Sequence, residues 1–380
     1  MARHIIKGAA IGTVSALALA AAGQAAAVDF QAGDTTVSIY GYMIGKMSYD
    51  MDENMGSATA GSFGNLVDDE QVDGYTDLDA NQSRIGFQTT TDMGGSDLVT
   101  RMEGDFLGGG GGQFRMRHAY GSWNGILAGQ TWSNWNSFVG TTPTVDFNGL
   151  AGNTGYQTRV AQFRYTVGDF SVALEDPKAR ILDEVGGEND DVAKDSLPAL
   201  SARYEGSSGP MGYSVAGIVH QLETADESES DAGYGAFAAA SYNFGAVTVR
   251  GALDYTDGAT SYLYQSGFEH FFAADGYIDA NGDLETVKAW GGTIGISVDA
   301  GPGTMNVSYG RTDIDEDDAT ALNGFETQSA VNQNVFVNYM WQPVERVTYG
   351  IEYSYWKAEN DEADFDADAN RVSVAAQYVF

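Results

Sequence analysis

Apolar and polar residues alternate with a period of two along much of this chain, most clearly in its last ten residues. A period of two places the two sets on opposite faces of a β-strand. In 371–380 the polar or small set is Arg371, Ser373, Ala375 and Gln377, and the apolar set is Val372, Val374, Ala376, Tyr378 and Phe380.

The same pattern predicts an all-β protein. Alternating or apolar segments recur, with turn-forming residues between them. We expect sixteen strands, at 35–49, 83–91, 98–106, 113–123, 126–133, 156–167, 170–175, 199–205, 211–222, 234–243, 247–256, 288–298, 304–312, 331–341, 347–357 and 371–380.

The links between these strands alternate between short and long. The short links contain turn residues, as in Asn124-Gly125 and Gly168-Asp169, which suit tight hairpins. An even number of strands, with short turns at one rim and long loops at the other, is typical of a transmembrane barrel. We therefore predict a sixteen-stranded antiparallel transmembrane β-barrel with short periplasmic turns and long extracellular loops. A soluble β-sandwich also alternates, but it does not explain this number of strands.

The amino terminus has the three regions of a secretory signal peptide. Basic residues lie within 3–7, a short apolar run spans 9–22, and small residues at 25–27 offer a cleavage site. The apolar run is shorter than the roughly 20 residues that a spanning helix needs, which favours a cleaved peptide over an anchor. We expect residues 1–27 to be removed and residues 28–380 to form one barrel domain.

Acidic residues lie mostly outside the expected strands. The formal net charge is −34, and the long links hold 40 of the 53 Asp and Glu residues but 3 of the 19 Lys and Arg residues. This distribution predicts a negative extracellular crown. A solvated surface explains the crown, and carboxylates that bind divalent cations next to lipopolysaccharide phosphates are the alternative. The chain has no Cys, which excludes disulfides and thiol chemistry.

Arginines on the expected strands have the parity opposite to the apolar residues. Charge facing lipid costs about 2–4 kcal/mol at mid-bilayer, so we expect these arginines to face the lumen. There they either guide anions, which suits a permanently charged guanidinium, or brace the wall in a lattice with carboxylates. The candidate pore-lining residues are Arg84, Arg101, Arg115, Arg117, Arg164, Arg203 and Arg250, together with Glu103 and Asp105.

The link 134–155 differs from the other long links because it is apolar and contains one acid. Its candidate constriction residues are Trp135, Phe138, Asp146 and Phe147. Exposed aromatic side chains are unfavourable in water. We therefore expect this loop to fold into the lumen and narrow the pore. The alternative is an ordinary surface loop in which only the aromatic residues next to the barrel are buried.

Chemistry other than transport has little support in the sequence. A hydrolase needs a nucleophile and a base within reach of one another, and the mature chain offers only His118, His220 and His270, of which His118 shares the apolar parity. Zinc, phosphate-loop and hydrolase motifs do not stand out. We expect no enzyme activity, cofactor, metal or nucleic-acid partner. A non-conducting barrel that acts as a surface adhesin or an outer-membrane hydrolase is the alternative.

Several short motifs resemble those of the DcaP-like outer-membrane porins. The closing strand with its terminal Phe also resembles that of bacterial outer-membrane barrels, where this ending is read by the insertion machinery. The motifs lie at 39–42 (IYGY), 83–87 (SRIGF), 101–106 (RMEGDF), 115–121 (RMRHAYG), 128–133 (AGQTWS), 338–344 (NYMWQPV) and 350–355 (GIEYSY).

The resemblance implies a homotrimer in the bacterial outer membrane, among lipids and lipopolysaccharide. It also implies a third loop in the lumen and an arginine-rich, water-filled channel for passive diffusion of small hydrophilic solutes, with a preference for small anions such as dicarboxylates. A helical extension found in some members is not expected here, because about seven residues separate the cleavage site from the first strand. The acidic crown opposes an anion preference at the outer mouth. The first five strands would form the subunit contact, with outward residues Gly41, Met43, Gly45, Phe114, Met116 and Tyr120.

Overall fold

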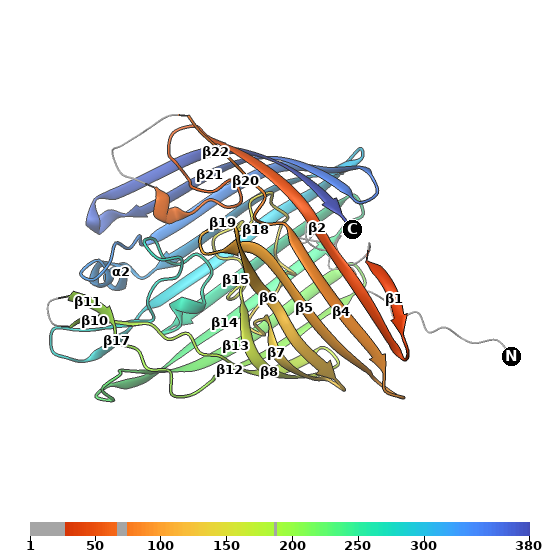
Figure 1. Ribbon diagram of the computed structural model, residues 1–380. Helices are drawn as coiled ribbons and strands as arrows, with labels where there is room; N and C mark the ends of the chain where they lie inside the picture. Colours follow the sequence, from red (N-terminus) through yellow and green to blue (C-terminus); the bar gives the residue numbers. More distant parts are fainter. Residues whose placement is uncertain (1–26, 67–73, 186–187) are drawn as a thin grey trace.

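The computed structural model describes residues 27–66, 74–185 and 188–380, and most of its regular elements are β-strands (Figure 1). The expected signal peptide lies outside these residues, apart from residue 27. Sixteen antiparallel strands close into a barrel, as the alternation predicted. They are β2 (Thr35–Asp50), β4 (Arg84–Asp92), β5 (Asp97–Gly108), β6 (Gln113–Trp123), β7 (Ile126–Trp132), β8 (Arg159–Val167), β9 (Phe170–Glu175), β12 (Ala199–Ser208), β13 (Met211–Glu223), β14 (Ser230–Asn243), β15 (Val247–Asp257), β18 (Lys288–Ala300), β19 (Gly303–Ile314), β20 (Val331–Val344), β21 (Val347–Asn360) and β22 (Phe365–Val379).

The barrel closes where β22 pairs with β2. The last residue, Phe380, accepts a backbone hydrogen bond from Gly41 at 3.1 Å and donates one to Gly41 at 3.0 Å. A short strand that was not predicted, β1 (Val28–Ala32), continues along the same edge of β2, with Val28 opposite Ile39. The β1–β2 hairpin projects beyond the rim on that side (Figure 1).

The two faces of the strands differ as the alternation requires. On β18, Ile294 and Ile296 are exposed, whereas Thr293 and Ser297 are buried. The outer face is therefore apolar and the lumen face polar, which is the pattern of a barrel that is surrounded by lipid. Among the described residues, no helix has the length and apolar character needed to cross a membrane.

The last hairpin is longer than predicted. β22 begins at Phe365 rather than 371, and β21 continues to Asn360, so a three-residue 3-10 turn replaces most of the expected loop 358–370. The alternation of this stretch was not recognised because acidic residues occupy every second position. The residues between them, Ala367 and Ala369, are buried in the lumen, at 3% and 0% exposed.

The long-loop end carries the remaining regular elements. A short strand, β3, extends the pairing of β2 beyond β4. A separate four-stranded sheet and a short helix lie at the same end of the barrel, on the left in Figure 1. Their bounds are β3 (Tyr75–Asp79), β10 (Ile181–Val185), β11 (Glu188–Asp191), β16 (Gly276–Ile278), β17 (Leu284–Thr286) and α2 (Glu316–Leu322).

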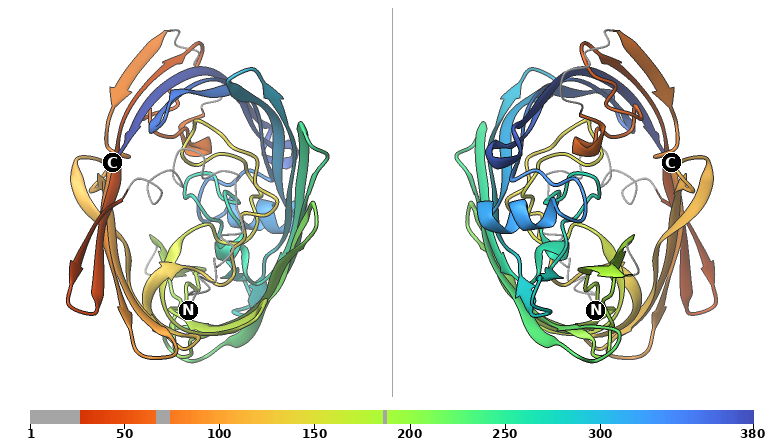
Figure 2. Two further views of the ribbon diagram at one scale, coloured as in Figure 1. Left: turned by 90° about the vertical axis from the view of Figure 1, so that its right-hand side faces the viewer. Right: turned by 90° about the vertical axis from the view of Figure 1, so that its left-hand side faces the viewer.

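Apolar clusters also form inside the barrel, where the long loops meet the wall. Trp356 of β21 packs edge-on against Phe336 of β20, with centroids 5.5 Å apart, and against Phe63 of the first long loop at 4.9 Å. Leu150 joins the same cluster. Figure 2 shows loop segments within the barrel outline when the molecule is viewed from either end.

Candidate functional site

Two of the predicted arginines converge on Glu103, which points from β5 into the lumen. Arg84 Nη1 lies 3.1 Å from Glu103 Oε1, and Arg101 donates to Glu103 Oε2. The hydroxyl of Tyr40 donates to the same carboxylate at 3.0 Å. Glu103 is 2% exposed, so its charge is compensated inside the barrel rather than by bulk water.

Asp105 compensates the other pair. Arg115 donates to it through two nitrogens, at 3.0 and 2.9 Å, and Arg117 donates at 2.7 Å. The Arg115 side chain is the most accessible of the four, at 41% exposed. The four arginines and two carboxylates therefore form one connected cluster on β4, β5 and β6, which contains the lattice that the sequence raised as an alternative.

A β-bulge in β6 decides which side chains belong to this cluster. Glu103 lies opposite His118, whereas the next residue, Gly104, lies opposite Met116, so Arg117 is the extra residue. An extra residue turns the following side chains to the other face of the strand. Arg117 and His118 are consequently both buried, at 3% and 4% exposed. The prediction that His118 shares the outward face is wrong for this reason.

The same bulge turns the side chain of Tyr120 from the expected outer face to the lumen side. Two residues beyond His118, its ring lies on the lumen side with the imidazole, at a centroid distance of 6.4 Å. His118 Nδ1 is 2.9 Å from the hydroxyl of Thr131 on β7. Tyr120 therefore does not belong to the outer face expected for the subunit contact, whereas Phe114 and Met116 do, at 57% and 48% exposed.

The other predicted arginines lie outside the cluster. Arg164 donates to the carbonyl oxygen of Trp132, and Arg203 donates to that of Asn136. Both thus hold the backbone where the third long loop leaves β7. Arg250 lies on β15, where it donates to the hydroxyl of Ser297 at 2.6 Å.

Arg159, the first residue of β8, was missed by the sequence. Arg159 and Phe163 are four residues apart, so a period of two along the strand would put both on the outward face, toward lipid. The turn at Gln157, with a φ of 50°, precedes Arg159, whose side chain instead reaches the cluster. Its Cζ lies 3.1 Å from the centroid of the Trp132 ring, and its charge interacts with those of Arg117 and Glu103.

The segment 133–158, which follows β7 and is yellow in Figure 2, crosses the inside of the barrel. Its path is fixed by carboxylates of the wall, namely Glu175, Asp254 and Glu352, which accept its backbone N–H groups. In the sequence these three acids are recognisable only as carboxylates at lumen parity on the expected strands. The N–H donors are Asn134 at 2.9 Å from Glu175, Gly155 at 2.7 Å from Asp254, and Val145 and Asp146 at 2.7 Å each from Glu352.

Glycines on the inner face of the wall let this loop approach closely. A methyl group at Gly295 of β18 would lie 2.0 Å from Thr142 Oγ1, and one at Gly310 of β19 would lie 2.3 Å from the carbonyl oxygen of Ala151. Such distances leave no room for a side chain. The loop is thereby pressed against β14 to β21, and the arginine cluster lies across the lumen on β4 to β6.

The four predicted loop residues have different positions. Phe147 lies beside the cluster, with its ring 5.2 Å from Arg117 Cζ, and Phe138 packs edge-on against Trp132 at 4.8 Å. Trp135 is fully buried away from the cluster and donates to the carbonyl oxygen of Tyr262 at 3.1 Å. Asp146 accepts hydrogen bonds from neighbouring backbone and is 6% exposed.

Two further loop segments also fold inward, contrary to the expectation that they form a solvated crown. In the segment 51–66, Gly61 donates to the carboxylate of Asp146 at 2.7 Å. In the segment 259–275, the hydroxyl of Tyr264 donates to the carbonyl oxygen of Asn148 at 3.0 Å. The physical reason is apolar burial, because both segments carry aromatic residues that pack in the lumen.

One acid of the expected crown, Asp275, is completely buried. It accepts hydrogen bonds from the backbone of Ser261 at 2.8 Å and of Arg180 at 3.0 Å. Burial outweighs these bonds and raises the pKa of Asp275 to about 8. Arg180 also donates to Glu326 at 2.9 Å, so one residue connects three long loops.

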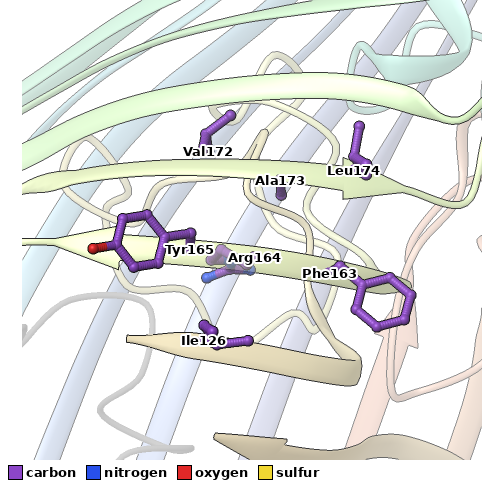
Figure 3. Close-up of a pocket in the computed structure, with 7 residues that line it drawn as sticks. All are labelled: Ile126, Phe163, Arg164, Tyr165, Val172, Ala173 and Leu174. Carbon is purple, nitrogen blue, oxygen red and sulfur yellow. The ribbon is translucent and has the colours of Figure 1, made fainter. Parts of the chain in front are cut away.

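The outer wall of β7 to β9 carries an apolar groove, shown in Figure 3. Phe163 and Ile126, at 69% and 56% exposed, are its most accessible lining residues. This groove lies on the outward face and takes no part in the lumen site. Within the described ranges, no group of three or more His, Asp or Glu side chains is arranged to hold a metal ion.

Comparisons with known proteins agree with this architecture. Residues 11–380 match a family model described as DcaP outer membrane protein. The outer membrane channel DcaP of Acinetobacter baumannii superposes with a TM-score of 0.78 and 23% identity, over 92% of this chain and 99% of that chain. An anion-selective porin from Comamonas acidovorans gives 0.57 and 17%, over 91% and 100%. OmpF of Salmonella typhi, in complex with daunomycin, gives 0.59 and 12%, over 93% and 100%. No curated protein matches the chain.

Proposed function

This chain belongs to the DcaP outer membrane protein family, and from that premise we propose that it is a passive diffusion channel that prefers small anions. Its place is the bacterial outer membrane, and its architecture is that of a porin-like channel. The observation that carries the anion preference is the luminal cluster, in which four guanidiniums pair with two carboxylates and the guanidinium of Arg159 lies beside them. The apolar outer belt would face lipid and lipopolysaccharide.

The passage that we propose runs between this cluster and the third loop. The loop and the two other inward segments occupy the side of the lumen next to β14 to β21, so solutes are directed along β4 to β8. Phe147 and Arg117, whose ring centroid and Cζ lie 5.2 Å apart, are in contact and bound one side of the narrowest point that we propose. A narrow passage of low dielectric strengthens the attraction between the guanidiniums and an anion. Because Glu103 and Asp105 offset part of the charge, an anion would move on rather than be held.

The acidic loops modulate this preference. Their repulsion of anions is screened within about 8 Å at physiological ionic strength, and charges in the constriction are screened less. Some of the acids contribute no free charge at the mouth, since Asp50 forms a buried ion pair with Arg371 and Asp275 is buried. We expect the wall to set the selectivity and the loops to oppose it mainly at low salt.

A homotrimer is part of the proposal. Met43 and Gly45 on β2 face outward, as do Phe114 and Met116 on β6, which is separated from β2 by β4 and β5 in the same wall. Small outward residues permit close packing of subunits. The apolar groove on β7 to β9 (Figure 3) continues this surface, because β7 pairs with β6. The native mass of the detergent-solubilised protein measures this state, and a single-barrel mass would exclude the trimer.

The competing function is a non-conducting barrel that acts as an adhesin or a hydrolase. The geometry that favours a hydrolase is a row of three side chains. His118 Nδ1 lies 2.9 Å from Thr131 Oγ1, and His118 Nε2 lies 3.8 Å from Glu103 Oε1. Glu103 is already held by two arginines, and Thr131 is 8% exposed. We therefore favour transport. Conductance in a planar bilayer separates the two, since a plugged barrel would stay nearly closed.

Reversal potentials across a KCl gradient test the anion preference. We expect the wild type to be anion-selective, and Arg101→Glu and Arg117→Glu to shift the reversal potential toward cation selectivity. Lys357→Glu makes the same change of charge on the outer face, where Lys357 pairs with Glu359 at 2.6 Å, and should have little effect. Cation selectivity of the wild type at high salt, or unchanged selectivity in both luminal variants, would refute the proposal.

A further inference from the structure

The guanidiniums around the constriction are not equivalent. Four of them form ion pairs with Glu103 or Asp105. Arg159 takes part in no ion pair or side-chain hydrogen bond within the described part of the chain, and its Nε atom is buried without a partner. Its charge is nevertheless close enough to Arg117 and Arg84 for mutual repulsion. Five guanidiniums face two carboxylates, and Arg159 is the one whose charge has no carboxylate partner among the described residues.

Trp132 fixes the orientation of this group. The Cζ of Arg159 lies over the indole ring, 3.1 Å from its centroid, and the two residues are direct partners across β7 and β8. The ring covers one face of the guanidinium and makes a cation–π contact. The planar N–H fork at the edge remains available, which is the part of an arginine that binds a carboxylate with two parallel hydrogen bonds.

A buried charge without a partner is unfavourable, and an anion that pairs with it recovers that cost. The Nε atoms of Arg117 and Arg84 are also buried without hydrogen-bond partners. A carboxylate beside Arg159 would therefore also lie near Arg117 and Arg84, whose ion pairs do not use every N–H donor. The paired arginines should bind an added carboxylate less well, because Glu103 and Asp105 already pair with their guanidiniums.

We propose that Arg159, oriented by Trp132, is the residue that binds one carboxylate of a permeating small dicarboxylate. This inference rests on the proposed anion channel and makes it more specific. Arg84, Arg101, Arg115 and Arg117 supply the surrounding positive field and brace the wall. Selectivity for carboxylates over chloride then depends on Arg159 more than on any of these four.

Block of the chloride current by succinate tests this assignment. We expect succinate to reduce the wild-type current in a concentration-dependent way, and Arg159→Gln to raise the half-blocking concentration about tenfold, the effect of losing one charge-assisted contact. Arg115→Gln is the matched control, since it removes an equal charge from a guanidinium that is paired with Asp105. It should change the half-blocking concentration by less than about threefold.

Arg159→Lys keeps the charge but loses the planar fork, and should retain chloride selectivity while its succinate block weakens. Heat-modifiable migration on gels shows whether each variant is folded, and Arg159→Lys replaces Arg159→Gln if the latter does not assemble. Suppose that the wild type is anion-selective but that Arg159→Gln has the same half-blocking succinate concentration as the wild type. That result would overturn this inference alone, and the same holds for Arg159→Lys where it replaces Arg159→Gln. A wild type without anion selectivity would instead overturn the proposed function.

Discussion

The carboxylate of Glu352 on β21 accepts the backbone N–H group of Asp146 in the third loop at 2.7 Å. The same carboxylate accepts the N–H group of Val145 at 2.7 Å and the side-chain amide of Asn338 at 2.9 Å. One acid of the wall thus fixes the part of the loop that adjoins Phe147 and the arginine cluster.

Replacing Glu352 with Ala should loosen the constriction. Two backbone hydrogen bonds to a charged acceptor are lost, at about 1.5–3 kcal/mol each, which is enough to allow the loop to leave the wall. We expect a larger single-channel conductance with more open-channel noise. Glu359→Ala on the same strand is the control, because Glu359 pairs with Lys357 on the outer face. Identical conductance in the two variants would mean that Glu352 does not hold the loop.

Gly310→Val should displace the same loop at a second contact with the wall. The new Cβ would lie 2.3 Å from the carbonyl oxygen of Ala151 and 2.8 Å from Leu150 Cβ, so the loop must move or the barrel must distort. We expect a loss of stability of a few kcal/mol, measured by urea unfolding in detergent, together with altered conductance. Gly95→Val, in a turn with nothing within 4 Å of the new Cβ, should leave both unchanged.

The inward segment 259–275 should become less stable as the pH rises. The pKa of Asp275 is raised to about 8 in the folded loop and is near 4 in a released loop. The folded loop therefore holds its proton more tightly, and its stability is complete below about pH 4 and falls progressively up to about pH 8. The protection of this segment against hydrogen exchange, expressed relative to the intrinsic exchange rate at each pH, should be lower at pH 8.5 than at pH 5.5. Asp275→Asn should remove most of that difference, and an unchanged pH dependence in this variant would contradict the assignment.

Deleting Phe380 should sharply reduce the amount of assembled barrel. The residue exchanges two backbone hydrogen bonds with Gly41, and its ring lies 2.8 Å from where a Cβ on Gly41 would be. Heat-modifiable protein in outer-membrane fractions is the measure. Full assembly of the truncated chain would show that the closing strand does not need its last residue.

The order of strands was available from the sequence because lipid imposes a simple rule on every strand. Apolar side chains must face out, as on β18, and charge must face in, as for Glu103 and Asp105, so the period of two predicts both the elements and their faces. The motifs at 101–106 and 115–121 further predicted the family. The aromatic loop 134–155 was recognisable because its side chains are unfavourable in water.

The arrangement inside the barrel depended on contacts between residues far apart in the chain. The bulge at Arg117 arises from pairing between β5 and β6, and it reverses the faces of His118 and Tyr120. Among the described residues Arg159 has no ion-pair partner, which follows from where Glu103 and Asp105 lie in space and is not specified by the alternation. The loop positions depend on Glu352 and on inner glycines such as Gly310. The sequence by itself determined a barrel with a charged lumen, because solvent on each face selects residue types strand by strand. Only the tertiary structure decided which charges remain free, since pairing depends on distances of a few ångströms across the lumen.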